Sequence, residues 1–385
     1  MIFIALKMLT GDRGKYFGIL FGLTIASFLI TQQLAIFMGL MTRTYGFITD
    51  SGFADIWVMD SKVQFVDDIK PMQDTQLLRV RGVEGVEWAV PLYKGILKAR
   101  LDNGNFQACN VIGLDDSTLI GGPATLLEGR LEDLRRADGI IIDSVGAAGK
   151  LAKRGPDGKP VPLKVGSVLE LNDHRAVVVG ICRISRTFQS QPVVYTTYTR
   201  ATTFAPMERK LLSFIQAKAK PGVPVKELTA RIAKITGLAA YTKAEFEDLT
   251  ILYFRKYTGI PINFGIAVLL GFLVGTAIAG QTFYNFTLEN LKYFAALKAM
   301  GATNLTLLGM VIVQAYLVGG IGYGLGTGLA TGFGSYFSAN SELAFRLPWQ
   351  VLVSSAVAIA FISAFAAFLS LWKVVRLEPA VVFKG

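Results

Sequence analysis

The chain has 385 residues, of which 52% are hydrophobic and 17% are charged, and its formal net charge is +11. This composition is too apolar for an ordinary soluble domain. The basic residues are scattered along the chain instead of forming a stripe, which argues against a nucleic-acid partner.

Four long segments contain no Asp, Glu, Lys, Arg or His, and they cover residues 16–42, 257–288, 299–341 and 347–372. Each exceeds the roughly 20 helical residues that cross a ~30 Å hydrocarbon core. We therefore predict a membrane α-helical protein with four transmembrane helices. The first is expected to be an uncleaved anchor, because it is longer than a signal peptide and lacks a clear cleavage site. The preceding MIFIALKML predicts an amphipathic interfacial helix, with the simple start of the span as the alternative.

The short polar ends of these segments predict the orientation. Residues 1–15, 285–303 and 373–385 together hold eight Lys or Arg and three Asp or Glu. In a four-span protein these ends lie on one side, and their positive charge favours the cytoplasm. The predicted segments are an N-terminal interfacial helix at 1–15, a span at 16–42, an α+β domain outside the cytoplasm at 43–258, a span at 259–284, a cytoplasmic helix at 285–303, a span at 304–334, a short outside loop at 335–348, a span at 349–373 and a cytoplasmic tail at 374–385.

The outside domain is predicted to be α+β because strand and helix patterns alternate along it. Apolar and polar residues alternate on both sides of Asn103-Gly104, and the pattern repeats around Asn172-Asp173. Each pair predicts a two-residue β-hairpin turn.

The domain is expected to end in a helix that begins at Thr242, which has capping-box spacing to Glu245. The helix is expected to run nearly unbroken into the second span, past Pro261. It would then either carry movement between domain and membrane or serve as a simple tether. The residues expected on its apolar stripe are Phe246, Leu249, Leu252 and Tyr253.

Groups that could support catalysis or metal binding are scarce. The chain has no GxxxxGK[ST] phosphate loop, and its only histidine, His174, sits beside a hairpin turn and is expected to be solvated. Cys109 and Cys182 fall in strand-like runs, where two buried free thiols are favoured and a disulfide is the alternative. The spans contain no ionisable side chain, which argues against an ion-coupled carrier. We therefore expect no catalytic residue, cofactor or metal site.

Small residues recur at every fourth position in three predicted spans, a spacing that lets helix backbones approach closely in lipid. Packing within one four-helix bundle is favoured, and the seam of a homodimer is the alternative. The stripes are Gly18, Gly22 and Ala26 in the first span, Gly271, Gly275 and Ala279 in the second, and Gly320, Gly324, Gly328 and Gly332 in the third.

The stretch ENLKYFAALKAMGATN at 289–304 predicts a short cytoplasmic helix between the second and third spans. Residues 288–300 have high helix propensity, Gly301 stands where a glycine ends a helix, and Thr303 can cap the next one. The apolar residues form no single face, so protein or lipid is expected to cover the helix on several sides. The charged residues available to a partner are Glu289, Lys292 and Lys298.

Several stretches together resemble the MacB/FtsX-type permeases of ABC transporters. ENLKYFAALKAMGATNLTLLGMVIVQA resembles the family's cytoplasmic loop and third span, and IALKMLTGDRGKYFGILFGLTIA its interfacial helix and first span. GVEGVEWAVPLYKG and LLEGRLEDLRRADGIIIDSVGAAGKL resemble its periplasmic domain, and VVRLEPAVVFKG its C-terminal tail. The similarity covers essentially the whole chain. Tyr293-Phe294-Ala295 replaces the usual E-I-G, and YFAALKAMG is closer to the DevC-like branch of exporter permeases.

The resemblance implies a non-catalytic, homodimeric permease in the bacterial inner membrane, with both termini cytoplasmic and ATP bound by separate ABC ATPase subunits. A periplasmic cargo, such as a lipid or glycolipid, would leave through an adaptor (membrane-fusion) protein and a TolC-like outer-membrane channel. The residues expected to couple the short helix to the ATPase are Glu289, Lys292, Tyr293, Phe294, Lys298 and Gly301.

Three alternatives stay open. A permease that extracts lipids or lipoproteins has the same plan, and so does an FtsX-like regulator of cell-wall hydrolases. An anchored binding or signalling module without an ATPase is the alternative from a different class. An ATPase partner would exclude that module.

Overall fold

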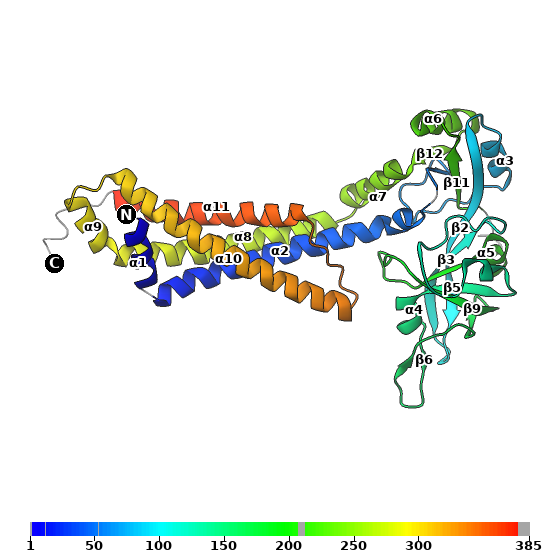
Figure 1. Ribbon diagram of the computed structural model, residues 1–385, viewed down its shortest axis with the longest axis horizontal. Coiled ribbons are helices and arrows are strands. Elements are labelled where there is room, and N and C mark those ends of the chain that lie inside the picture. Colours follow the sequence, from blue (N-terminus) through cyan, green and yellow to red (C-terminus); the bar gives the residue numbers. More distant parts are fainter. Residues whose placement is uncertain (1, 12, 53, 207–211, 376–385) are drawn as a thin grey trace. The chain divides into compact units, whose positions relative to one another are not determined.

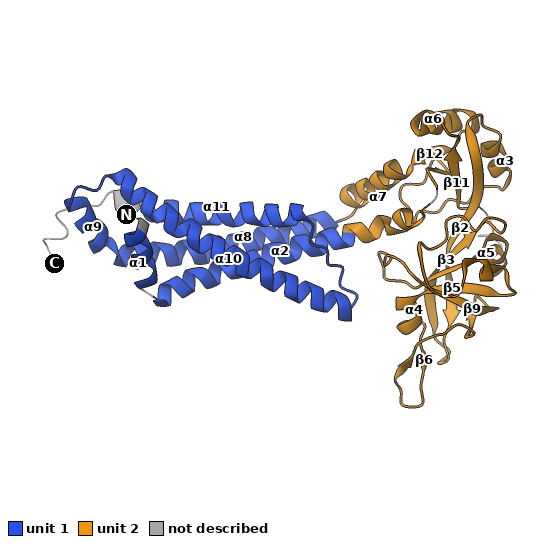
Figure 2. Cartoon of the chain, viewed as in Figure 1, with its two compact units in different colours: residues 1–40, 259–385 blue, residues 41–258 orange. Residues whose placement is uncertain are grey.

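The computed structural model describes residues 2–11, 13–52, 54–206 and 212–375. The chain divides into two compact units, which are coloured separately in Figure 2. The membrane unit comprises residues 1–40 and 259–385, and the outside domain comprises residues 41–258. The outside domain is therefore inserted between the first and second long helices, as predicted.

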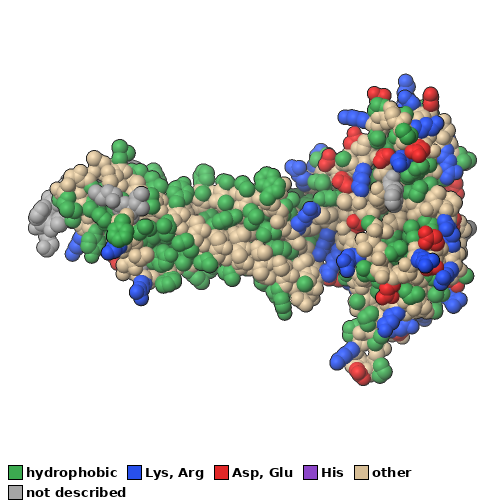
Figure 3. Space-filling model, in the orientation of Figure 1, with side chains coloured by type: hydrophobic (Ala, Val, Ile, Leu, Met, Phe, Trp, Pro, Cys, Tyr) green, Lys and Arg blue, Asp and Glu red, His purple; other side chains and the backbone are tan. Residues whose placement is uncertain are grey.

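The membrane unit is entirely helical in its described part (Figure 1). Among the described residues, four of its helices are long and apolar enough to cross a membrane, which confirms the predicted class: α2, α8, α10 and α11. Figure 3 shows hydrophobic side chains along the visible face of this unit. The helices are α1 (Ile2–Gly11), α2 (Arg13–Asp50), α8 (Ile260–Glu289), α9 (Leu291–Ala299), α10 (Asn304–Asn340) and α11 (Trp349–Val375).

Three helices extend several residues beyond their predicted ends, and the first of them, α2, continues past the predicted end at 42 to Asp50. The second span continues as α8 to Glu289, and the third continues as α10 to Asn340. No proline or turn signal interrupts either run, and Ser341 ends α10 by donating its hydroxyl to the Phe337 carbonyl at 2.6 Å. The predicted tail at 374–385 lies, beyond Val375, outside the described residues.

The outside domain combines helices with a mixed sheet, which confirms the predicted α+β class. Among the described strands the order is β12-β1-β11-β2-β3-β10-β5-β9-β4, with β8 beside β2 and β9. Its elements are β1 (Ile56–Met59), α3 (Thr75–Arg81), β2 (Val86–Arg100), β3 (Phe106–Leu114), β4 (Thr125–Glu128), a 3-10 helix (Leu131–Arg135), β5 (Gly139–Asp143), α4 (Ser144–Ala148), β6 (Lys153–Arg154), β7 (Pro160–Val161), β8 (Val168–Leu171), β9 (His174–Arg183), β10 (Val193–Thr197), α5 (Tyr198–Phe204), β11 (Phe214–Ala219), α6 (Val225–Thr236), β12 (Ala239–Thr242) and α7 (Lys243–Tyr257).

Both predicted hairpins form, with different turns. Asn172 and Asp173 have φ angles of 48° and 65°, as the two central residues of a type I′ turn require. The prediction of a two-residue turn at Asn103-Gly104 is wrong. There the Leu101 amide bonds the Asn105 carbonyl at 2.8 Å, so three residues form the loop and Gly104 takes the left-handed position at φ 80°.

The helix α7 does not run unbroken into the second span, which corrects that expectation. Its capping box forms as predicted, with the Thr242 hydroxyl accepting from the Glu245 amide at 3.2 Å. At its other end Thr258 is extended, with φ −117° and ψ 152°, and α8 begins afresh at Ile260. Pro261 explains the break, because proline lacks the amide donor that a continuing helix needs and its ring clashes with the preceding turn.

The two faces of the sheet bury separate apolar cores. Ile140 and Ile142 of β5 face one core, and Ile141 between them faces the other. Cys109 lies in the first core and Cys182 in the second. Both thiols are buried and free, as favoured from the sequence, because the sheet itself separates them. Burial raises the pKa of each thiol to about 12.

We predict that neither cysteine of the folded protein reacts with maleimide at pH 8. With a pKa of about 12, only about one thiol in 10⁴ is ionised at that pH, and the thiolate is the reactive form. The measurement is mass spectrometry of the labelled chain, with the guanidinium-unfolded chain as the control that labels twice. Rapid labelling of either cysteine in the folded protein would contradict the buried assignment.

Candidate coupling surface

The short helix α9 ends in a hydrogen-bonded glycine cap. The Gly301 amide bonds the Lys298 carbonyl at 3.1 Å, and the Ala302 amide bonds the Leu297 carbonyl at 3.0 Å. This pair of bonds defines a Schellman motif. Gly301 has φ +93°, a conformation that side-chain-bearing residues rarely adopt. The helix therefore ends where the sequence predicts, and the next begins with the Thr303 hydroxyl accepting from the Thr306 amide at 3.3 Å.

One side of α9 is anchored in the core of the membrane unit. Phe294, Ala295 and Leu297 are almost completely buried. Phe294 and Leu297 join a cluster that includes Phe286 of α8 and Met310 of α10. Because the buried residues come from the middle of the helix, α9 is held firmly against both neighbouring spans.

The other side of α9 is exposed and lies next to the N-terminal helix. Tyr293 is 62% exposed and Phe3 of α1 is 69% exposed. Both line a groove of about 530 Å³, together with Lys7 of α1 and Glu289. Lys7 lies over the Phe3 ring at 5.1 Å from its centroid. The result is an aromatic and basic surface, which we call the coupling surface.

The predicted coupling residues do not all lie on the coupling surface. Lys292 and Tyr293 are exposed, whereas Phe294 is buried as an anchor. Glu289 lines the same groove and also forms an ion pair with Lys15, which joins the start of α2 to the end of α8. The contribution of α1 was missed, because sequence spacing cannot show which terminal helix packs beside a distant loop.

A buried glutamine holds α1 in place. Gln314 of α10 is fully buried, and its side-chain amide donates to the Ala5 carbonyl of α1 at 2.7 Å. The separate helix α1 packs Ala5 and Leu9 into the core of the membrane unit, while Phe3 and Ile4 stay exposed. The position of α1 at a membrane interface stays a prediction.

The glycine stripes divide into two groups. In the first and second spans they face each other: a Cβ on Gly22 would lie 2.5 Å from Ile278, and one on Gly18 would lie 3.4 Å from Thr282. Gly271 meets Ile30 in the same way, and Gly275 meets Ala26.

The stripe in the third span does not pack within the chain, which corrects the favoured interpretation. Among the described residues nothing lies within 4 Å of a Cβ on Gly320, Gly324, Gly328 or Gly332. The glycines of α10 that meet α2 are instead Gly322 and Gly326. Both sets of glycines recur every four residues, so the spacing alone does not show which set faces the other helices of the bundle.

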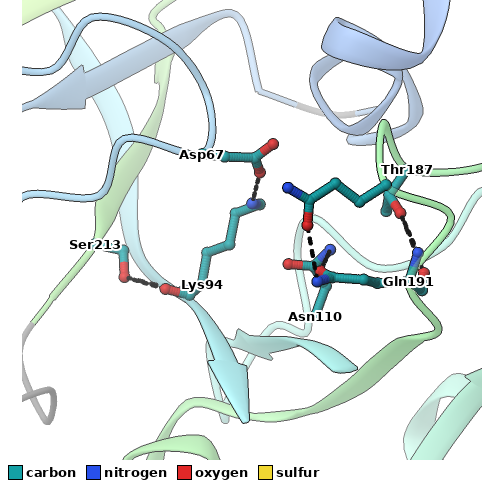
Figure 4. A network of polar contacts seen from close by, with 7 residues as sticks. Asp67, Lys94, Asn110, Thr187, Gln191 and Ser213 are labelled. Atoms are coloured by element: carbon teal, nitrogen blue, oxygen red, sulfur yellow. Dashed lines mark hydrogen bonds and ion pairs between the residues drawn. The ribbon is translucent and has the colours of Figure 1, made fainter. Parts of the chain in front are cut away.

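A buried polar cluster lies in the outside domain, next to the outward end of α2 (Figure 4). Lys94 is only 4% exposed; it forms an ion pair with Asp67, and its amide donates to the Ser213 hydroxyl at 2.9 Å. Its ammonium also lies 5.5 Å from the ring centroid of Phe47 of α2. The cavity beside it has a volume of about 20 Å³, which is room for about one water molecule, so the cluster is structural.

Groups suited to metal or acid–base chemistry are not gathered elsewhere in the described residues. No group of three or more His, Cys, Asp or Glu side chains comes together there. His174 is exposed at the start of β9, as expected, with its ring 5.7 Å from that of Phe204. The coupling surface is therefore the best-defined candidate site.

Comparisons with known proteins give two family matches. The profile described as "MacB-like periplasmic core domain" matches residues 17–235, more than half of the chain. The profile described as "FtsX-like permease C-terminal" matches residues 265–379. A comparison with curated proteins finds no significant match.

Solved structures with similarity to the outside domain include two transporter domains. The extracellular domain of the ABC-type transporter YknZ from Gram-positive bacteria is 16% identical, covers 49% of this chain and 98% of its own, and has a TM-score of 0.35. The periplasmic region of MacB from Actinobacillus actinomycetemcomitans is 15% identical, covers 52% of this chain and 94% of its own, and has a TM-score of 0.38.

We predict that Lys94→Ala lowers the free energy of unfolding by about 2–3 kcal/mol, because it leaves a cavity where the buried stem of Lys94 packed. Lys94→Met keeps most of the volume and should cost less. The matched control is Lys98→Ala, at an exposed position of the same strand. Thermal unfolding of the full chain in detergent measures the difference, and equal melting temperatures for the two alanine variants would contradict it.

Proposed function

Because this chain belongs to the MacB/FtsX-type permeases of ABC transporters, we propose that it relays movement from separate ATPase subunits to its outside domain and thereby drives export. It is a multi-pass membrane protein, and its family works with an ABC ATPase. The single observation that carries the proposal is the helix α2, which is continuous from the membrane unit into the outside domain.

The length of α2 suits this role. Its 38 residues span about 57 Å at 1.5 Å per residue, whereas the hydrocarbon core is about 30 Å thick. The remainder of the helix continues into the outside domain. The return connection differs, since the helix path breaks between α7 and α8. We propose that α2 is the stiff member of the pair and that the break at 258–259 accommodates the movement.

The outward end of α2 is fastened to the outside domain by polar and aromatic contacts. Asp50 accepts from the amide of Ser185 at 2.7 Å and from its hydroxyl at 3.1 Å. The Thr49 carbonyl, which has no partner within the helix, accepts from the Lys243 ammonium at 2.8 Å. Phe47 packs edge-to-face on Trp57. A displacement of α2 would therefore move the sheet with it.

The coupling surface supports docking of the ATPase at the other end of the membrane unit. Its anchored side connects to the spans, and its exposed side offers Tyr293, Phe3 and Lys7. We propose that this end and both termini are cytoplasmic, in the bacterial inner membrane. ATP would be bound by the partner subunit, and this chain would supply no catalytic group.

The cargo and the outer partners are proposed from resemblance to the DevC-like branch. In this proposal a lipid, glycolipid or other periplasmic cargo passes through an adaptor protein and a TolC-like channel. The spans lack ionisable side chains, which supports a mechanical role over ion-coupled transport. Lipoprotein extraction and FtsX-like control of cell-wall hydrolases are the alternatives, and copurification of an adaptor and channel separates them from export.

We predict that Tyr293→Asp weakens binding of the ATPase at least tenfold, because it buries a charge at the centre of the interface. Deletion of residues 289–298 or Gly301→Pro should abolish binding while leaving membrane insertion intact. The measurement is copurification and titration of the ATPase in nanodiscs. The control is Phe106→Asp, which changes an aromatic residue of similar exposure in the outside domain. Wild-type binding by the α9 variants would reject the coupling role.

A second prediction concerns the homodimer. The open stripe of Gly320, Gly324, Gly328 and Gly332 is proposed as its seam, because small residues permit close helix contact in lipid. Gly324→Leu should therefore lower the dimer fraction at least tenfold at limiting concentration, as measured by single-molecule photobleaching in bilayers. Gly265→Leu, at an equally open glycine of α8, should have no effect. Loss of dimer only in the α8 variant would place the seam there.

A further inference from the structure

The loop between α10 and α11, residues 341–348, packs against α2 where that helix leaves the membrane unit. The Arg346 amide donates to the Ala35 carbonyl of α2 at 3.1 Å. A Cβ on Gly39 would lie 2.6 Å from the Ala344 backbone, so a glycine is needed for the two backbones to approach this closely. We call this loop the clasp, because it holds α2 in one register along the bundle.

The clasp is itself attached to α10 at two points. The Phe345 ring lies in a notch of that helix, where a Cβ on Gly334 would be 2.2 Å from a ring atom. The Leu343 amide donates to the Ser341 hydroxyl at 3.2 Å, and this hydroxyl donates to the Phe337 carbonyl. Any movement of α2 along its axis must therefore pass a loop that α10 holds in place.

The residues of α2 that face α8 become larger in the outward direction, which is the direction in which α2 continues into the outside domain. At every fourth position they are Gly18, Gly22, Ala26 and Ile30, opposite Thr282, Ile278, Gly275 and Gly271. A shift by one helical turn, about 5.4 Å, brings each residue close to the position of its neighbour in this series. An outward shift therefore places a residue of smaller or equal size at each contact, with Gly14 taking the place of Gly18.

An inward shift meets steric resistance from both neighbours of α2. Ala26 would take the place of Gly22, where a Cβ would lie 2.5 Å from a side chain of α8. Arg43 would take the place of Gly39 beneath the clasp, which has no room for even a Cβ. An outward shift brings Ala35 there instead, so the clasp has to accommodate only one methyl group. The contacts of α2 thus oppose inward movement more strongly than outward movement.

Buried hydroxyl groups on α2 tolerate an outward shift as well. The Ser27 hydroxyl donates to the Tyr323 carbonyl of α10 at 3.2 Å. The hydroxyls of Thr24 and Thr31, about one turn to either side, have no hydrogen-bond partner among the described residues. After an outward shift Thr24 approaches the Tyr323 carbonyl in place of Ser27, so one of the three hydroxyls stays paired. Since an unpaired polar group in an apolar environment is costly, this exchange removes one barrier to the movement.

The bilayer also permits a shift of this size. Residues 16–42 carry no charge, and 27 helical residues are about 40 Å long. The hydrocarbon core is about 30 Å thick, which leaves about 10 Å of uncharged helix. A shift of about 5.4 Å lies within this surplus, so neither Lys15 nor Arg43 has to enter the hydrocarbon.

We propose that α2 moves outward past the clasp by about one helical turn when the ATPase works, and that the clasp stops the return at the register of the structure. This inference rests on the proposed function and specifies the movement that carries the force. Displacement of one packed element past another by a turn is an established form of conformational change. Asp50 and Phe47 fasten the far end of α2 to the sheet, so the outside domain would move outward with it.

The test uses disulfide crosslinking of the full chain with its ATPase in nanodiscs. The pair Ala35→Cys and Arg346→Cys reports the register of the structure, and the pair Thr31→Cys and Arg346→Cys reports the register one turn outward. ATP with vanadate should lower the crosslinked fraction of the first pair about fivefold and raise that of the second pair about fivefold. Cys109 and Cys182 are buried and should not compete. Arg346→Cys alone is the matched control and should form no crosslink within the chain.

A locked variant tests whether this movement is required. Oxidation of the chain with Ala35→Cys and Arg346→Cys should abolish the nucleotide-driven movement of the outside domain, and a reducing agent should restore it. Loss of the first crosslink without gain of the second, or no change in either while the outside domain moves, would overturn the proposal. So would absence of the first crosslink without nucleotide, because a backbone hydrogen bond joins these two residues. Failure of the ATPase to bind would contradict the proposed function instead.

Discussion

Hydrocarbon offers a peptide group no hydrogen-bond partner, and this constraint shapes the membrane unit more than any single contact. Each span must satisfy its own backbone, so it must be a continuous helix across the core of the bilayer. A helix under that constraint is also a stiff rod. The 38 residues of α2 therefore give the chain a rod that is longer than the membrane is thick.

Contacts at both ends of α2 connect it to the rest of the chain. At the outer end, Asp50 and Phe47 fasten α2 to the sheet through polar and aromatic contacts. At the other end, Lys15 pairs with Glu289 just before the short helix α9, whose Phe294 is buried between the spans. In the proposed function, a push on α9 would reach the start of α2 through this ion pair and a packed core.

Much of this organisation follows from the sequence because its causes are local. Uninterrupted apolar runs predicted the four spans by their length. Asn172-Asp173 predicted a turn and Gly301 predicted the end of α9, because each position needs a backbone conformation that few residue types adopt. Most errors have a common cause, which is tertiary packing. Three features depend on which surfaces pack together: the register of Gly320, the exposure of Leu252, which was expected on the apolar stripe of α7, and the proximity of α1 to α9. The periodicity of a sequence does not determine which surfaces pack together. Two errors were local instead: the loop at Asn103-Gly104 has three residues where two were expected, and the helix breaks before Pro261 where it was expected to run nearly unbroken.

The central claim is tested most directly by measuring movement of the outside domain when the ATPase works. A spin label at residue 157, on the exposed turn between β6 and β7, reports the distance between the two outside domains of the proposed dimer. In nanodiscs with the ATPase, pulsed electron paramagnetic resonance should show a distance distribution that shifts when ATP and vanadate are added. The shift should vanish when residues 289–298 are removed. Identical distributions with and without nucleotide, in complexes that continue to hydrolyse ATP and export cargo, would contradict the account.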